Sequence, residues 1–150
     1  MAEASKGEYL VGVDLGGTKI LAGIFTTSLK CVGRSKMSTK AERGPESVIE
    51  RIAHCIQDAV DECDLNLKQV RGVGIGSPGS IDSENGRVMF AGNLGWKDVG
   101  LKKELEGLLG LPVFCTMTAT SARWGFMKWS WKASRATWWG FFWAPASAAG

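Results

Sequence analysis

The chain has 150 residues, of which 45% are hydrophobic and 22% charged, a balance that is ordinary for a globular protein and excludes collagen-like and disordered classes. No apolar run is long enough for a transmembrane helix, and the short polar segment before Tyr9 lacks the apolar stretch of a secretory signal. The net charge of +3 is unevenly spread, because residues 116–150 hold four basic residues and no acidic one. We therefore expect a cytoplasmic protein with no membrane partner.

The four cysteines contain no C-x-x-C pair, so the sequence predicts neither a zinc site nor a disulfide framework. We expect reduced, mostly buried thiols at Cys31, Cys55, Cys63 and Cys115.

The first half of the chain predicts three strands and a helix. An apolar run over residues 9–14 ends in a glycine-rich turn, and the strand pattern resumes over residues 20–25, which predicts a β-hairpin. Residues 31–37 predict a third strand. Proline is tolerated at the first position of a helix, so Pro45 opens a helix whose apolar spacing continues to about Asp64.

A further strand is predicted over residues 70–75. After it, the Asn85-Gly86 pair is a hairpin signal that joins Ile81 to residues 88–90.

A second helix is expected to begin at Asp98, a favourable N-cap residue, and to end before Gly110. Its apolar face is expected to consist of Leu101, Leu105 and Leu108. Residues 111–115 predict a last strand. The order β-β-β-α-β-α-β predicts an α/β fold with a mixed sheet flanked by helices.

The turn after the first strand carries the residue types of a phosphate site. Two adjacent glycines, Gly16 and Gly17, allow a turn with positive φ and bring backbone N–H groups close to a ligand. These groups, with the Thr18 hydroxyl and the Lys19 ammonium, suit phosphate oxygens, and Asp14 suits a hydrated Mg²⁺ beside them. The alternative is an ordinary Gly-Gly hairpin with a solvated aspartate.

Residues 74–79 match the dinucleotide pattern G-x-G-x-x-G, and Asp98 lies 19 residues further on. That fingerprint must open a helix. The residues that follow Gly79 predict a turn and a hairpin instead, so a dinucleotide-binding oxidoreductase is the less favoured alternative.

The segments VGVDLGGTK, GVGIGSPGSID and NLGWKDVGLKKEL resemble, in this order and spacing, the ROK family of sugar kinases and related repressors. The resemblance covers roughly residues 8–115. It implies that residues 1–115 form the N-terminal lobe of an actin-like ATPase (ribonuclease H-like) fold. It also implies ATP and Mg²⁺ as cofactors, a hexose substrate, most often glucose phosphorylated on its 6-hydroxyl, and a homodimer for the full-length form.

The family's site residues can be placed on this chain through the matching motifs. The resemblance implies that the first phosphate loop consists of Asp14, Gly16, Gly17, Thr18 and Lys19, with Asp14 holding Mg²⁺ through water. It implies that the sugar cleft is lined by Ser77, Pro78 and Gly79, with Asn93 close to it. Trp96 could line the cleft or pack in the core. Only eight residues precede Tyr9, too few for the helix-turn-helix of the family's repressors, so we expect no nucleic-acid partner.

The family's catalytic base, an aspartate, is expected near Thr118, but no acidic residue follows Glu106. A shifted reading frame restores it, because the codon for Met117 (ATG) followed by that for Thr118 (AC-) contains GAC, an aspartate codon. The same frame permits the family's second phosphate loop, GTGxGGG, within residues 137–150.

We therefore interpret residues 116–150 as an out-of-frame tail without a native domain, and expect the chain as written to be catalytically dead. Two alternatives remain open at this point. One is an aromatic and basic segment that stacks on bases or lies at a membrane interface, since six of the seven tryptophans fall in the tail. The other is a non-enzymatic fragment that binds nucleotide or a partner.

Overall fold

The computed structural model describes residues 9–28 and 30–117. The helices and strands are, in chain order, β1 (Tyr9–Leu15), β2 (Lys19–Thr26), β3 (Cys31–Ser38), α1 (Pro45–Glu62), β4 (Val70–Ser77), β5 (Ser80–Asp82), β6 (Arg87–Ala91), β7 (Trp96–Val99), α2 (Leu101–Leu109) and β8 (Val113–Met117). Three single 3-10 turns, η1 (Ala41–Arg43), η2 (Leu67–Gln69) and η3 (Gly92–Leu94), lie between them.

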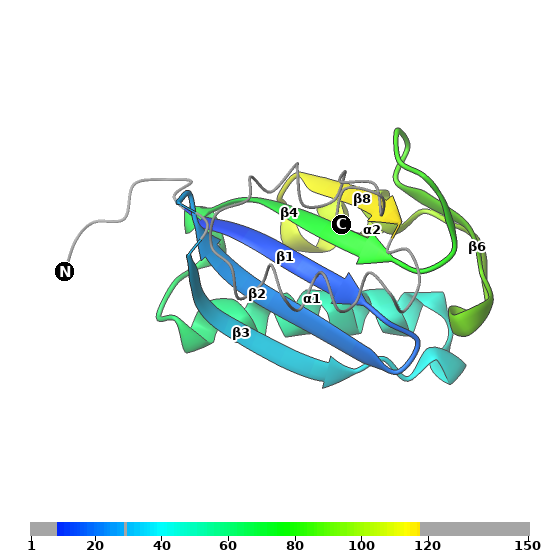
Figure 1. Ribbon diagram of the computed structural model, residues 1–150, viewed down its shortest axis with the longest axis horizontal. Coiled ribbons are helices and arrows are strands. Elements are labelled where there is room, and N and C mark those ends of the chain that lie inside the picture. The colour runs from blue at the N-terminus through cyan, green and yellow to red at the C-terminus, as the bar shows by residue number, and fades with distance from the viewer. Residues whose placement is uncertain (1–8, 29, 118–150) are drawn as a thin grey trace, which may run out of the picture.

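Five strands form one mixed sheet in the order β3-β2-β1-β4-β8. The pairs β1–β2 and β2–β3 are antiparallel, whereas β4 runs parallel to both β1 and β8. Helix α1 packs against β1, β2 and β3, while α2 packs against β8 and α1, so both helices lie behind the sheet in Figure 1. The expected mixed sheet flanked by helices is confirmed.

Helix α1 joins the sheet through a continuous apolar face. It begins at Pro45, as predicted, and buries residues at helical spacing: Val48, Ile49, Ile52, Cys55, Ile56, Ala59 and Val60. On the sheet side, β1 buries every residue from Val11 to Leu15, so this central strand forms the middle of the core.

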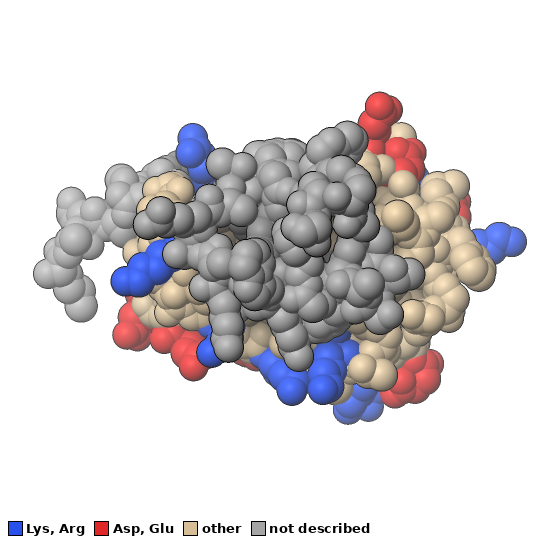
Figure 2. Space-filling view, in the orientation of Figure 1, with Lys and Arg blue, Asp and Glu red and all other residues tan. Residues whose placement is uncertain are grey.

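The edge strand β3 alternates between half-buried and exposed side chains, and it exposes Arg34 and Lys36. Figure 2 shows basic side chains gathered along the lower edge of the view, where Figure 1 places β3. Charges on an edge strand oppose edge-to-edge pairing with another chain.

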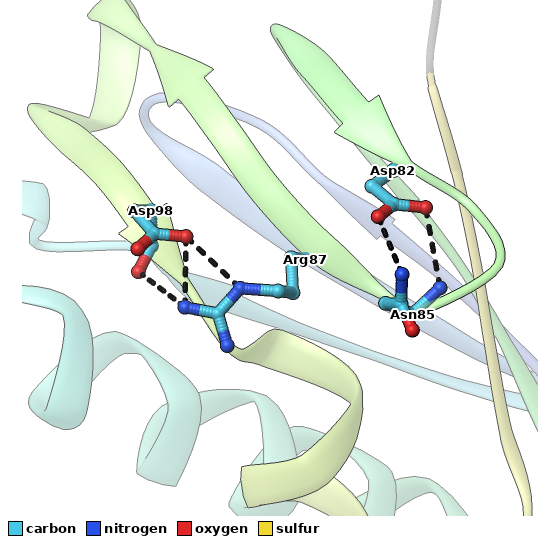
Figure 3. Close-up of polar contacts among 4 residues, drawn as sticks. All are labelled: Asp82, Asn85, Arg87 and Asp98. Carbon is cyan, nitrogen blue, oxygen red and sulfur yellow. Dashed lines mark hydrogen bonds and ion pairs between the residues drawn. The ribbon is translucent and has the colours of Figure 1, made fainter.

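A second, three-stranded sheet has the order β5-β6-β7 and is antiparallel throughout. The hairpin predicted at Asn85-Gly86 is confirmed. Its turn is held by the Asp82 carboxylate, which accepts hydrogen bonds from the side-chain amide of Asn85 at 2.7 Å and from the backbone N–H of Asn85 at 3.3 Å (Figure 3).

The predicted start of the second helix is wrong. Asp98 is not an N-cap but lies in β7, and α2 begins three residues later at Leu101. Strand β7 pairs with β6, and this pairing brings the Asp98 carboxylate to Arg87, 2.7 Å from Nη2 and 2.9 Å from Nε (Figure 3). The Asp98 carboxylate, which the sequence predicts to cap α2, therefore forms a cross-strand ion pair instead.

The predicted apolar face of α2 is wrong at one position. The buried residues are Leu101, Leu105 and Leu109, whereas Leu108 is 54% exposed. Spacings of three and of four residues both fit a helical period, and here the packing on β8 and α1 selects the spacing of four. The predicted end of the helix is confirmed, because Gly110 adopts a left-handed conformation with φ of 66°.

All four cysteines are free thiols; Cys55 and Cys115 are buried, while Cys31 and Cys63 are half-buried. Within residues 9–28 and 30–117 no helix is long and apolar enough to cross a membrane, and no cluster of three or more metal-ligating side chains occurs. The interpretation of residues 116–150 as an out-of-frame tail falls almost wholly outside the described residues.

The corrected register of α2 predicts unequal effects of two identical truncations. Leu105→Ala should lower the free energy of unfolding by about 2–5 kcal/mol, because Leu105 is fully buried and truncation leaves a cavity. Leu108→Ala should change it by only about 0.5 kcal/mol, because that side chain faces solvent. Urea unfolding measures both, and equal losses would contradict the register.

Candidate functional site

The expected site residues gather at one end of the main sheet. The parallel register sets Asp14, near the end of β1, opposite Gly76, so Ser77 follows at the end of the neighbouring strand. Ser77 is in turn opposite Met117, the last residue of β8. Three parallel strands thus end at the same edge, which is where open α/β sheets bind their ligands.

The loop that joins β1 to β2 is a tight turn closed by a 2.9 Å hydrogen bond from the Gly16 N–H to the Lys19 carbonyl. Neither Gly16 nor Gly17 adopts positive φ, so the expectation of a left-handed turn is wrong. The glycines provide space instead. A Cβ on Gly16 would lie 3.0 Å from the Lys19 carbonyl oxygen, and one on Gly17 would lie 3.2 Å from the Cβ of Asn93.

Asn93 lies in η3, between β6 and β7, and therefore reaches the loop from the second sheet. The contact with Gly17 brings together two residues that the sequence assigned to different ligands, one to phosphate and one to sugar. The side chains of Thr18 and Lys19 are exposed at the same turn and have no partner among the described residues. The loop therefore presents a hydroxyl and an ammonium group to solvent beside Asn93.

Thr39 holds this loop in place, and the sequence reasoning missed it. Its hydroxyl donates a 2.7 Å hydrogen bond to the Gly16 carbonyl, and its N–H donates one of 2.9 Å to the Thr18 carbonyl. The residue is fully buried. A threonine that follows a strand carries no signal of its own, so only the tertiary structure reveals this role.

Asp14 is the most unusual residue of the site. Its side chain is 2% exposed, and neither carboxylate oxygen has a hydrogen-bond partner among the described residues. Burial raises the pKa of Asp14 from 3.8 to about 6. The alternative of a solvated aspartate is therefore wrong. A buried carboxylate with two unused oxygens suits a hard cation or its bound water, and so Asp14 fits the expected Mg²⁺.

The segment after β4 is tightly packed. Ser77 is fully buried, and its hydroxyl donates a 3.3 Å hydrogen bond to the Pro78 carbonyl. Gly79 has φ of 91°, and a Cβ there would overlap the carbonyl oxygen of Phe90. The structure therefore gives Gly79 a packing role, while the sugar contacts expected of Ser77, Pro78 and Gly79 remain predictions.

The dinucleotide alternative is excluded. Gly79 is followed by the strand β5 and a turn, not by the helix whose N-terminus would bind pyrophosphate.

The remaining two predictions concern Trp96 and the position of the catalytic base near Thr118. Trp96 is 1% exposed and belongs to the core cluster, which favours its packing role over a place on the cleft wall. Thr118, near which the family's base is expected, lies outside the described residues. The preceding strand β8 does end beside Ser77, at the edge that holds Asp14.

Comparisons with known proteins agree with this arrangement. The family model described as ROK family matches residues 10–137. The glucokinase of Thermotoga maritima is 42% identical over 106 residues, which are 70% of this chain and 32% of that protein. A putative xylose repressor from Caldicellulosiruptor sp. is 30% identical over 120 residues, 80% of this chain and 30% of that protein. The chain thus spans about a third of the length of these relatives.

The structural comparison agrees with the sequence comparison. A ROK family glucokinase from Streptomyces griseus, in complex with glucose and AMPPNP, superposes with a TM-score of 0.67 at 32% identity. The match covers 78% of this chain and 35% of that chain. The expected fold, the N-terminal part of an actin-like ATPase, is confirmed by this likeness and by the mixed sheet itself.

The packing at Gly79 predicts a larger penalty than its backbone conformation alone would cause. Gly79 and Gly44 share φ of 91°, but a Cβ on Gly44 meets nothing within 4 Å. Each alanine substitution should cost about 1–3 kcal/mol for the positive-φ backbone, which residues with a side chain rarely adopt. Gly79→Ala should lower the free energy of unfolding by about 1–3 kcal/mol more, because its Cβ would clash with the carbonyl oxygen of Phe90. Urea unfolding of both variants checks this, and equal losses would refute the packing role.

The burial of Asp14 predicts a specific dependence of stability on pH. Because the folded state holds the Asp14 proton more tightly than the unfolded chain, the free energy of unfolding should fall as pH rises from about 4 to about 6. The component due to this residue is up to about 3 kcal/mol. Asp14→Asn should remove it. The measurement is urea unfolding across this pH range without Mg²⁺. Glu50 is exposed, so Glu50→Gln is the matched control and should leave the profile unchanged.

Proposed function

The chain belongs to the ROK family, and from this premise we propose that it derives from an ATP-dependent hexose kinase, a glucokinase that phosphorylates the 6-hydroxyl of glucose. The observation that carries the proposal is the buried Asp14 carboxylate, which has no hydrogen-bond partner among residues 9–28 and 30–117 and lies next to an exposed loop of phosphate-binding character. The likeness to glucokinases at 42% and 32% identity supports it.

Each part of the loop has a role in this proposal. The backbone N–H of Gly17 and the side chains of Thr18 and Lys19 bind phosphate oxygens of ATP, and Thr39 keeps Gly16 and Thr18 in position. Asp14 holds Mg²⁺ through water. When bound, the Mg²⁺ neutralises charge on the transferred phosphoryl group.

The sugar is proposed to bind where the two sheets meet. Asn93 lies against Gly17, and Ser77 ends the strand next to Asp14, so a hexose there would lie close to the terminal phosphate. Phosphoryl transfer depends chiefly on this positioning and on electrostatic stabilisation. Pro78 and Gly79 complete the wall of the proposed cleft.

We further propose that residues 1–115 are the functional lobe and that residues 116–150 are read from a shifted frame. The sequence has no acidic residue after Glu106, so the base that takes the proton of the sugar hydroxyl is not encoded near Thr118. The chain as written should therefore not turn over sugar. A cytoplasmic location and a homodimer of the full-length form belong to the same proposal.

A non-catalytic role is the second candidate. The putative xylose repressor among the relatives matches 80% of this chain. Without an acidic residue after Glu106 to act as the base, the lobe could still bind ligands but not transfer phosphate. In that case the lobe binds nucleotide, sugar or a partner without transferring phosphate.

A paired activity assay tests the kinase proposal. The 150-residue chain is compared with a longer version, in which the shifted frame is restored after Cys115 and read on through the downstream DNA to about the length of the relatives. Both are incubated with glucose, ATP and Mg²⁺, and ADP formation is measured. The chain as written should show no glucose-dependent turnover, and the restored chain should show it. Replacing the restored aspartate with asparagine should lower kcat by about 10²–10⁴-fold, the usual contribution of a general base.

Two outcomes would count against the proposal. Turnover by the 150-residue chain at the restored chain's rate would refute its inactivity and the need for the restored base. A restored chain that folds, binds glucose and yields no ADP would favour the non-catalytic candidate.

A further inference from the structure

Two cysteines that are distant in sequence meet at one glycine. Cys31 begins β3, and its Sγ donates a 3.5 Å hydrogen bond to the carbonyl of Gly33. Cys63 directly follows α1, and its Sγ occupies the place that a Cβ on Gly33 would take. Because Gly33 has no side chain, the Cys63 sulfur can pack directly against the strand that carries Cys31.

The other two thiols lie in different surroundings. Cys55 is fully buried on the apolar face of α1, and Cys115 is 5% exposed in β8. Cys31 and Cys63 are both half-buried, so solvent and small reagents reach them. Accessibility and a shared neighbour therefore single out one pair among the four cysteines.

We propose that Cys31 and Cys63 form a dithiol site that low-molecular-weight disulfides oxidise to an intramolecular disulfide. In the first step the Cys31 thiolate attacks one sulfur of the small disulfide, whose S–S bond breaks and releases one thiolate, which takes up a proton. In the second step Cys63, losing its proton, attacks the Cys31 sulfur and expels the second small thiol. Two protein thiols are oxidised, and the two electrons reduce the small disulfide to two thiols.

The surroundings explain the order of the steps. Burial raises the pKa of Cys63, and the neighbouring carboxylate of Glu62 raises it further, so Cys63 keeps its proton and is the poorer first nucleophile. Once Cys31 carries the small thiol, the contact of both cysteines with Gly33 places Cys63 to attack it. Burial also raises the pKa of Cys115 to about 12, which adds to its protection.

The bond would join the edge strand β3 to the end of α1. A crosslink between these elements restricts the unfolded chain, so the oxidised protein should unfold at a higher urea concentration than the reduced protein. This inference is independent of the proposed kinase function.

Peptide mapping after oxidation tests the proposal. The reduced 150-residue chain is incubated with oxidised glutathione under native conditions, alkylated, digested and examined by mass spectrometry. The expected product is a linked Cys31–Cys63 peptide that has lost two hydrogen atoms, with Cys55 and Cys115 found alkylated after denaturation. Cys63→Ser should stop the reaction at a glutathione adduct on Cys31. The control Cys55→Ser should leave the yield of linked peptide unchanged.

The proposal would be overturned by a lasting glutathione adduct on Cys31 in the unchanged chain, because Cys63 would then be out of reach. Linked peptides that contain Cys55 or Cys115, or four thiols that stay unreacted, would overturn it equally.

Discussion

The buried Asp14 carboxylate, at the edge where three parallel strands end, is the constraint on which the candidate site depends. Burying an ionisable group costs free energy unless something compensates for it, and the described residues supply Asp14 with no hydrogen bond. The residue before it, Val13, and the one after it, Leu15, belong to the apolar core. A chain optimised for stability alone would place an apolar residue at Asp14. The proposed Mg²⁺, held through water, would compensate for this burial.

The loop that follows Asp14 is held in place by contacts from β3 and from the second sheet. Thr39 ties the start of the loop to the end of β3 through two hydrogen bonds, so the edge strand of the sheet fixes where the loop lies. Gly17 lets Asn93 approach from the second sheet. The turn η3 between β6 and β7 thus contacts the loop, and the ion pair between Arg87 and Asp98 connects these two strands (Figure 3).

Much of the fold could be predicted from sequence, because its signals are local. Apolar runs, the Gly-Gly and Asn-Gly turns and Pro45 each determine an element from neighbouring residues. The errors have non-local causes. Strand β7 forms through pairing with β6, which converts Asp98 from an expected cap into an ion-pair partner, and tertiary packing chooses Leu109 over Leu108. In the site, Asp14 and Lys19 were recognisable by residue type, whereas the role of Thr39 arises only when β3 folds against the loop.

The titration of the Asp14 carboxyl group shows whether this buried carboxylate binds a cation. Carbon NMR of this chain would follow that carboxyl across the pH range without Mg²⁺, and then with Mg²⁺ and a non-hydrolysable ATP analogue at saturating concentrations. We expect a pKa of about 6 in the free protein and a lower pKa when the metal and nucleotide are bound. A free-state pKa near 3.8, or a raised pKa that the metal and nucleotide leave unchanged, would contradict it.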